Sequence, residues 1–347
     1  LLGDVWPFGG RNPAGSPDFH PDALAAWEEA RDAAPEGERG RLIAAEPCAV
    51  SSSDAAAVLE GIGVGRFHER GAIDFLRSLG DAVAGVFGGG ATLAASLPPA
   101  GLFPPVGAGL LARSFDAVGL DVFGWPARSG SLDRDARLVA GSVRRPFASF
   151  VSVGAPTWLP HLADADPLYG VQVCLAAGLN GLVLSMGVGR DRWCGGLLDE
   201  ALHEHESAHR FRRLLHGLGR SSWLHGRRRP LAALLVPRDY ARGAFASSAA
   251  LLGPPGPGFA GAFGFPPAGA LAGDDRSPGG GAWWRWFEAA ESALQELGVD
   301  YELVDDEGPL AVEAPLLLVP TLEDVPAATA ERLRAHVARG AAVLLGP

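Results

Sequence analysis

The sequence GLVLSMGVGRDRWCG, residues 181–195, decides the fold of this chain. Its first six residues have the length and composition of a buried β-strand, and the charged residues after them predict a loop at the end of that strand. Further back along the chain, the apolar runs 117–123 and 146–153 alternate with the helix-length segments 131–143 and 167–179. Strands separated by helices predict a parallel sheet with helical crossovers, and therefore an α/β fold.

The same alternation of strands and helices extends over residues 1–226. Amphipathic spacing predicts further helices, and apolar runs predict further strands, one of them interrupted by glycines. The strands are expected at Leu1–Phe8 and Gly85–Ala95, and the helices at Pro21–Ala33, Phe67–Val83 and Leu197–Leu218.

A second αβ pattern occupies residues 227–347 and contains a Gly/Pro-rich loop at 252–281. It predicts an open, doubly wound sheet. The chain stops just after a strand, where a further helix is expected, so both ends of the sequence look truncated. The strands are expected at Leu231–Val236, Tyr301–Val304, Pro315–Val319 and Ala341–Leu345, and the helices at Trp283–Leu297 and Ala327–Arg339.

Composition excludes several classes of function. The 347 residues carry a net charge of −11 and no lysine, which argues against nucleic acid or an anionic membrane as the main partner. We interpret the basic run 227–229 as a solvated turn. No apolar run reaches the ~18 residues of a membrane helix. The three cysteines are odd in number and lack C-x-x-C spacing, and no signal peptide is visible, which together favour reduced thiols and a cytoplasmic location.

Segment 181–195 resembles the last barrel strand of bacterial β-galactosidases of glycoside hydrolase families 35 and 42, whose pattern is close to GFNLYMxxxRDRWYG. The RDRW run and the final glycine match, whereas Ser185 and Cys194 stand where the family usually has tyrosine. The opening residues 3–23 resemble the fourth strand and the DYHPDA run that follows it. Residues 284–347, with YELVDDE and LLLVPTLEDV, resemble the flavodoxin-like trimerisation domain of family 42.

The resemblance implies a (β/α)8 barrel of which only strands four to eight are present, in residues 1–226. It also implies a truncated flavodoxin-like domain in residues 227–347 and a possible homotrimer. Five strands alone leave an apolar edge exposed, so a missing N-terminal part is expected.

The resemblance also implies where the two catalytic glutamates belong. The proton donor falls on Trp6, and the nucleophile falls on Phe150, from PFASFVSVG against the family's PFxxExxxG. Neither side chain can transfer a proton or form a covalent intermediate. We therefore expect a non-catalytic homologue that binds a glycan or has a structural role, with no cofactor and no metal.

Several polar and aromatic residues lie at or near the carboxyl ends of the expected strands, the face on which barrel active sites lie. The aromatic residues either stack on sugar rings or fill the core and rim. Asp121 either binds a sugar hydroxyl or forms a salt bridge at the rim. The candidate sugar-binding residues are Asp4, Asp121, Trp125, Trp158, Arg190, Asp191 and Trp193.

Two alternatives stay open. In the first, the chain is an active glycosidase whose acids are Asp4, Asp121 or residues further upstream. In the second, His205, Glu206 and His209 form an HExxH zinc site of a hydrolase. No third ligand of the usual kind follows that motif, and a solvated helix face is the simpler interpretation. The sequence GIGVG at 61–65 resembles the glycine-rich loop of a dinucleotide-binding site, but its third glycine is misplaced for that motif. We expect a turn there.

Overall fold

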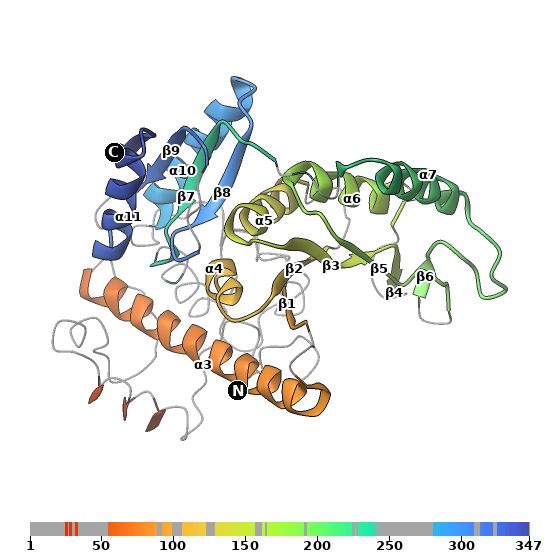
Figure 1. Cartoon of the computed structure of the whole chain (residues 1–347), viewed down its shortest axis with the longest axis horizontal. Coiled ribbons are helices and arrows are strands. Elements are labelled where there is room, and N and C mark those ends of the chain that lie inside the picture. Colours follow the sequence, from red (N-terminus) through yellow and green to blue (C-terminus); the bar gives the residue numbers. More distant parts are fainter. Residues whose placement is uncertain are drawn as a thin grey trace.

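A computed structural model of the chain describes two four-stranded sheets with their helices (Figure 1). The structure describes residues 25–26, 28–29, 32–33, 55–88, 92–98, 106–122, 129–156, 162–163, 165–190, 193–223, 226, 228–239, 242, 280–308, 313–321 and 325–346. The expected strand Leu1–Phe8 and most of the Gly/Pro-rich loop lie outside these residues. The described residues of the expected helix Pro21–Ala33 are helical.

The first sheet has four parallel strands in the order β1-β2-β3-β5. Side chains that alternate along these strands, such as Val118, Leu120 and Val122, form a core with the covering helices. The residues between them point to the opposite face of the sheet, as the period of two in a strand requires. The strands are β1 (Ala94–Leu97), β2 (Ala117–Val122), β3 (Pro146–Ser152) and β5 (Leu182–Ser185), and the helices are α4 (Ala108–Ala112), α5 (Ser129–Ser142) and α6 (Asp166–Ala177).

The expected strands 117–123, 146–153 and 181–186 are confirmed within two residues, as are the helices α5 and α6. The strand predicted at Gly85–Ala95 was wrong, because its first residues belong to the long helix α3 (Ala55–Phe87) and the strand β1 begins at Ala94. The turn predicted at residues 61–65 was also wrong, because these glycines lie within α3. At Gly65 a Cβ would lie 2.9 Å from the Cβ of Arg242, so glycine lets the helix approach that residue closely.

The helix predicted at Leu197–Leu218 begins later than expected, as α7 (Glu206–Arg220). A tight turn precedes it. The Asp199 side chain accepts the backbone N–H of His203 at 2.8 Å, and Leu202 adopts a positive φ of 65°. Such local side-chain bonds compete with helix formation, which explains why the amphipathic pattern overestimated the helix.

The second sheet is also parallel, with the order β10-β9-β7-β8. The central strand β7 is buried along its whole length. Phe287 and Leu294 of α10 pack on one of its faces, and Leu333 of α11 packs on the other. The predicted elements are all confirmed, as β7 (Ala232–Val236), α10 (Gly280–Glu296), β8 (Tyr301–Asp305), β9 (Leu316–Pro320), α11 (Ala327–Ala338) and β10 (Ala342–Gly346).

Helix α5 joins the two sheets, because it packs on β2 and β3 and also along the edge strand β8 (Figure 1). At Gly141 a Cβ would lie 2.2 Å from the carbonyl oxygen of Leu303, so only glycine allows this approach. The Ser142 hydroxyl accepts the backbone N–H of Asp305 at 2.9 Å, and Arg137 donates to the carbonyl of Tyr301 at 2.6 Å. Side chains of α5 thereby satisfy backbone groups that an edge strand would leave unpaired.

A buried ion cluster connects α3 to the second sheet. Glu69 of α3 accepts hydrogen bonds from Arg238 at 2.8 Å and from Arg242 at 2.7 Å, and all three side chains are buried. Its carboxylate also accepts the backbone N–H of Gly107 at 2.6 Å. Removal of one member would leave buried charge without its counter-charge, so the cluster fixes α3 against both sheets.

In the part of the chain that the structure describes, no helix combines the length and the apolar character needed to cross a membrane.

Candidate functional site

Three polar side chains meet on the face of the first sheet opposite the described helices. Ser96 extends from β1, Asp121 from β2 and Ser149 from β3. The two hydroxyl oxygens lie 2.5 and 3.0 Å from Oδ1 of Asp121, respectively, and 2.6 Å from each other. Three oxygens from three adjacent strands thus form a triangle with a possible hydrogen bond on every side. We refer to Ser96, Asp121 and Ser149 as the Ser–Asp–Ser triad.

The geometry of the triad bears on the protonation of Asp121. Two hydroxyl groups supply two protons, whereas three short oxygen–oxygen contacts require three. A protonated carboxyl group would complete the ring. In agreement, burial raises the pKa of Asp121, and the hydrogen bonds from Ser96 and Ser149 lower it by less. A neutral carboxyl group can donate a hydrogen bond, which a carboxylate cannot do.

A β-bulge positions the triad. Leu120 pairs with Ala148, but the next residue, Asp121, pairs with Phe150, which leaves Ser149 as the extra residue of β3. Gly119 provides the space for this arrangement, because a Cβ there would lie 2.4 Å from the Cβ of Ser149. Any larger residue at position 119 would displace the serine.

Asp121 is the only acidic residue within the four described strands of the first sheet. Phe150, the residue at the expected nucleophile position, is its partner in the adjacent strand. Glycosidases of the common type need two carboxyl groups, about 5–5.5 Å apart for retention and about 6.5–9.5 Å apart for inversion. The described strands therefore supply at most one of the two groups.

Two further predicted residues lie beyond the carboxyl ends of β3 and β5. A short antiparallel pair forms there from β4 (Gly154–Pro156) and β6 (Trp193–Gly195). Half-buried Trp193 exchanges backbone hydrogen bonds with exposed Arg190, at 2.8 and 3.1 Å. Both residues thus lie in the rim of the sheet. The other candidates, Asp4, Trp6, Trp125, Trp158 and Asp191, lie outside the described residues.

The HExxH segment does not have the geometry of a zinc site. His205 precedes α7 in an extended conformation, so it does not share a helical face with His209. Glu206 instead pairs with Arg210 at 3.1 Å, and His209 lies 3.6 Å from Glu204. Among the described residues there is no group of three or more potential metal ligands.

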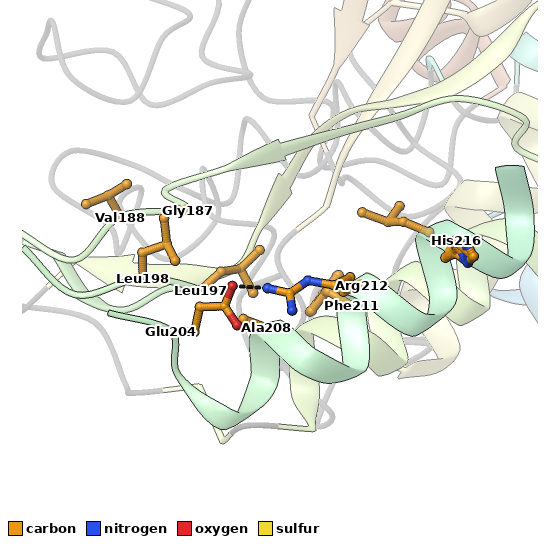
Figure 2. Close-up of a pocket in the computed structure, with 10 residues that line it drawn as sticks. Gly187, Val188, Leu197, Leu198, Glu204, Ala208, Phe211, Arg212 and His216 are labelled. Atoms are coloured by element: carbon orange, nitrogen blue, oxygen red, sulfur yellow. Dashed lines mark hydrogen bonds and ion pairs between the residues drawn. The ribbon is translucent and has the colours of Figure 1, made fainter. Parts of the chain in front are cut away.

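A separate pocket of about 490 Å³ lies between α7 and the loop that follows β5 (Figure 2). Its wall is mostly apolar. Glu204 and Arg212 form an ion pair across it, and His216 lies at its other end. The apolar wall consists of Gly187, Val188, Leu197, Leu198, Ala208, Phe211 and Leu215. The pocket therefore lies beside the first sheet and does not include the triad.

At the level of sequence, the chain matches no protein-family model and no curated protein. Its structure is similar to a β-galactosidase from the psychrophilic Marinomonas ef1, with a TM-score of 0.62 and 14% identity over 94% of this chain and 52% of the other. The haloarchaeal β-galactosidase of Halorubrum lacusprofundi gives a TM-score of 0.63 and 16% identity over 94% and 49%. A GH42 β-galactosidase from G. stearothermophilus gives a TM-score of 0.59 and 14% identity over 82% of this chain and 41% of the other.

The chain has a β-galactosidase-like fold. It spans about half the length of these β-galactosidases. The four parallel strands of the first sheet, with their helices, accordingly form part of a barrel, and the α/β fold expected from the sequence is confirmed.

Sequence reasoning identified Asp121 but missed Ser96 and Ser149. A signal was present, because all three residues lie on strands and face away from the buried alternate positions. The bulge, however, shifts the register of β3 at Ser149. A strand pattern read from sequence alone does not reveal such an extra residue.

Proposed function

We propose that this chain is a β-galactosidase-like scaffold that binds a carbohydrate without cleaving it. The observation that carries the proposal is the Ser–Asp–Ser triad, a single carboxyl group held by two hydroxyls on the face of the sheet opposite the described helices. The carboxyl oxygens and the two hydroxyl groups can exchange hydrogen bonds with sugar hydroxyl groups where a sugar replaces contacts within the triad. The described strands of the first sheet supply no second carboxyl group of the kind that glycoside hydrolysis requires.

The rim supports the same proposal. The indole of Trp193 can stack on the apolar face of a sugar ring, and Arg190 and Asp191 can bind its hydroxyl groups. Trp125, Trp158 and Asp4 are proposed as further contacts from the neighbouring strand ends. We also propose that residues 1–226 and 227–347 form separate domains, the second of them flavodoxin-like, and that the chain assembles as a homotrimer, as its resemblance to family 42 implies.

A second candidate function rests on the raised pKa of Asp121. Glycosidases use a carboxyl group with a raised pKa as their proton donor. In that case Asp121 would donate the proton, and a second acid outside the described strands would act on the anomeric carbon.

One experiment separates the two candidates. We expect no hydrolysis of an aryl β-galactoside above background, and binding of galactose or lactose that calorimetry detects. Asp121→Ala should weaken this binding, whereas Asp74→Ala, at an exposed position of α3, should not. Hydrolysis by the wild type that Asp121→Ala abolishes would favour the active glycosidase. The absence of binding to any neutral saccharide would overturn the proposed function.

A further inference from the structure

The charge of this chain is unevenly distributed. The protein as a whole has a net charge of −11, yet residues 209–229, HRFRRLLHGLGRSSWLHGRRR, contain seven arginines, three histidines and no acidic residue. Helix α7 forms most of this segment and lies at the opposite end of the molecule from the second sheet (Figure 1). A basic surface of this kind attracts negatively charged partners.

Three residues of α7 form a continuous basic line. Arg213, His216 and Arg220 follow each other at spacings of three and four residues, so they lie on one face of the helix. All three are exposed. We call these three residues the cationic stripe. Trp223 lies three residues beyond the end of α7 and is 55% exposed, so an aromatic ring follows the stripe in the chain.

Several other basic side chains near the cationic stripe are paired with acids. Arg210 pairs with Glu206, Arg212 with Glu204, and Arg228 with Asp300. No acidic side chain in the described part of the chain forms an ion pair with Arg213 or Arg220. The charge of the stripe is therefore available to a partner.

The pocket of Figure 2 runs along the same helix. His216 belongs both to the stripe and to the pocket wall (Figure 2). Leu215, the residue before it, also lines the pocket and is 41% exposed. A partner bound along the stripe would therefore lie next to this apolar pocket and close to the indole of Trp223, which follows Arg220 in the chain. This combination suits a molecule with anionic groups and flat apolar faces.

We propose that the cationic stripe, with Trp223, binds a linear anionic polysaccharide. Arginine recognises carboxylate and sulfate groups through paired hydrogen bonds. Arg213 and Arg220 are seven positions apart, about 10 Å along the helix, so a chain charged on successive sugars can reach both arginines. Stacking on Trp223 adds a contact to a sugar ring.

The overall charge favours a polysaccharide over nucleic acid or a membrane. A duplex or a lipid surface is broad, and it would bring its charge close to the rest of a chain whose net charge is −11. A single polysaccharide chain needs to touch only the stripe. This surface is separate from the Ser–Asp–Ser triad, so each of the two proposals can fail without the other.

Fluorescence anisotropy with a labelled oligogalacturonate tests the proposal on the full chain. We expect saturable binding that weakens as salt is added, and no binding of a neutral galactan of the same length. Arg213→Glu combined with Arg220→Glu should weaken binding at least about tenfold, because it replaces two attractive charges by two repulsive ones. The matched control is Arg144→Glu with Arg334→Glu, two exposed arginines elsewhere, which should leave binding unchanged.

Trp223→Ala should weaken binding while its salt dependence stays the same, because stacking is not an ionic contact. If the charge reversal unfolds the protein, Arg213→Gln with Arg220→Gln tests the same point. Unchanged binding in a folded stripe variant, equal loss in the control, or no binding at all would overturn the proposal. Tighter binding of a single-stranded oligonucleotide or of phosphatidylglycerol vesicles would also overturn it and assign the stripe to that class of partner.

Discussion

Asp121 and Phe150 are direct partners in adjacent parallel strands, one residue beyond the bulge of β3. The strand spacing places their backbones about 4.8 Å apart. The position expected for a catalytic nucleophile is therefore occupied by an aromatic ring next to the one acidic residue in the described strands of the first sheet. This pairing determines how a carboxylate introduced at position 150 would behave.

Phe150→Glu alone will not create glycosidase activity. The introduced carboxylate would lie beside Asp121, where two like charges and partial burial oppose its ionisation. Release of nitrophenol from an aryl β-galactoside checks the prediction, with Phe150→Gln as a control of similar size without the charge. Robust turnover by Phe150→Glu, absent from Phe150→Gln, would show that a proton donor is already in place.

Gly141→Ala will destabilise the protein by about 2 kcal/mol, as expected for overpacking of a close contact. Its Cβ would meet the carbonyl oxygen of Leu303 at 2.2 Å. Gly217→Ala is the matched control, because its Cβ on α7 would meet nothing within 4 Å. Alanine there should instead stabilise the helix by about 0.5–1 kcal/mol. Urea denaturation measures both free energies of unfolding, and equal effects would contradict the close packing of α5 on β8.

Asp306→Asn will make stability less sensitive to pH. Burial raises the pKa of Asp306 from 3.8 to about 7, and the neighbouring Asp305 adds to the rise. Because the folded state favours the protonated form, its stabilising contribution is complete below about pH 4 and is lost as the pH rises through about 7. The full shift corresponds to at most about 4 kcal/mol.

Asparagine retains the acceptor for the backbone N–H of Arg238 and can donate to the Thr329 hydroxyl. We therefore expect the variant to gain stability relative to the wild type at pH 8 and to gain little at pH 5. Thermal unfolding over this pH range tests the expectation. A difference between the two proteins that is the same at every pH would contradict the assigned titration.

His205→Ala and His209→Ala will leave the fold and the binding of neutral sugars unchanged. His205 precedes α7 and His209 is exposed, and their imidazoles do not converge on a common point of one helical face. Substitutions at exposed positions usually change stability by no more than about 0.5 kcal/mol. Circular dichroism and metal analysis provide the measurements. One zinc ion per wild-type chain, lost together with an activity in either variant, would restore the metal-site hypothesis.

The sequence predicted most of the regular elements because apolar runs dominate them. The strands β2, β3 and β7 have buried alternate or continuous apolar residues, and their positions, like that of β5, were found within two residues. The failures have local causes. The glycines at 61–65 suggested a turn, but close packing against Arg242 keeps them helical. The bond from Asp199 to His203 delays α7, which hydrophobic spacing could not indicate.

The site was less predictable than the fold. Asp121 was identified because it follows an apolar run, and Arg190 and Trp193 because of their motif. Ser96 and Ser149 become partners of Asp121 only through strand order and the bulge, both of which depend on long-range contacts. The buried cluster around Glu69 was missed for the same reason, since its arginines lie more than 160 residues away in sequence.

Because α5 covers the edge strand β8, it also limits where a further strand could pair with the second sheet. A strand from another molecule cannot add at β8, because Gly141, Ser142 and Arg137 already occupy that side. The opposite edge is β10, whose Leu344 and Leu345 are more than half exposed. Among the described strands, β10 is therefore the edge from which a further strand, from the same chain or from a neighbouring one, would extend this sheet.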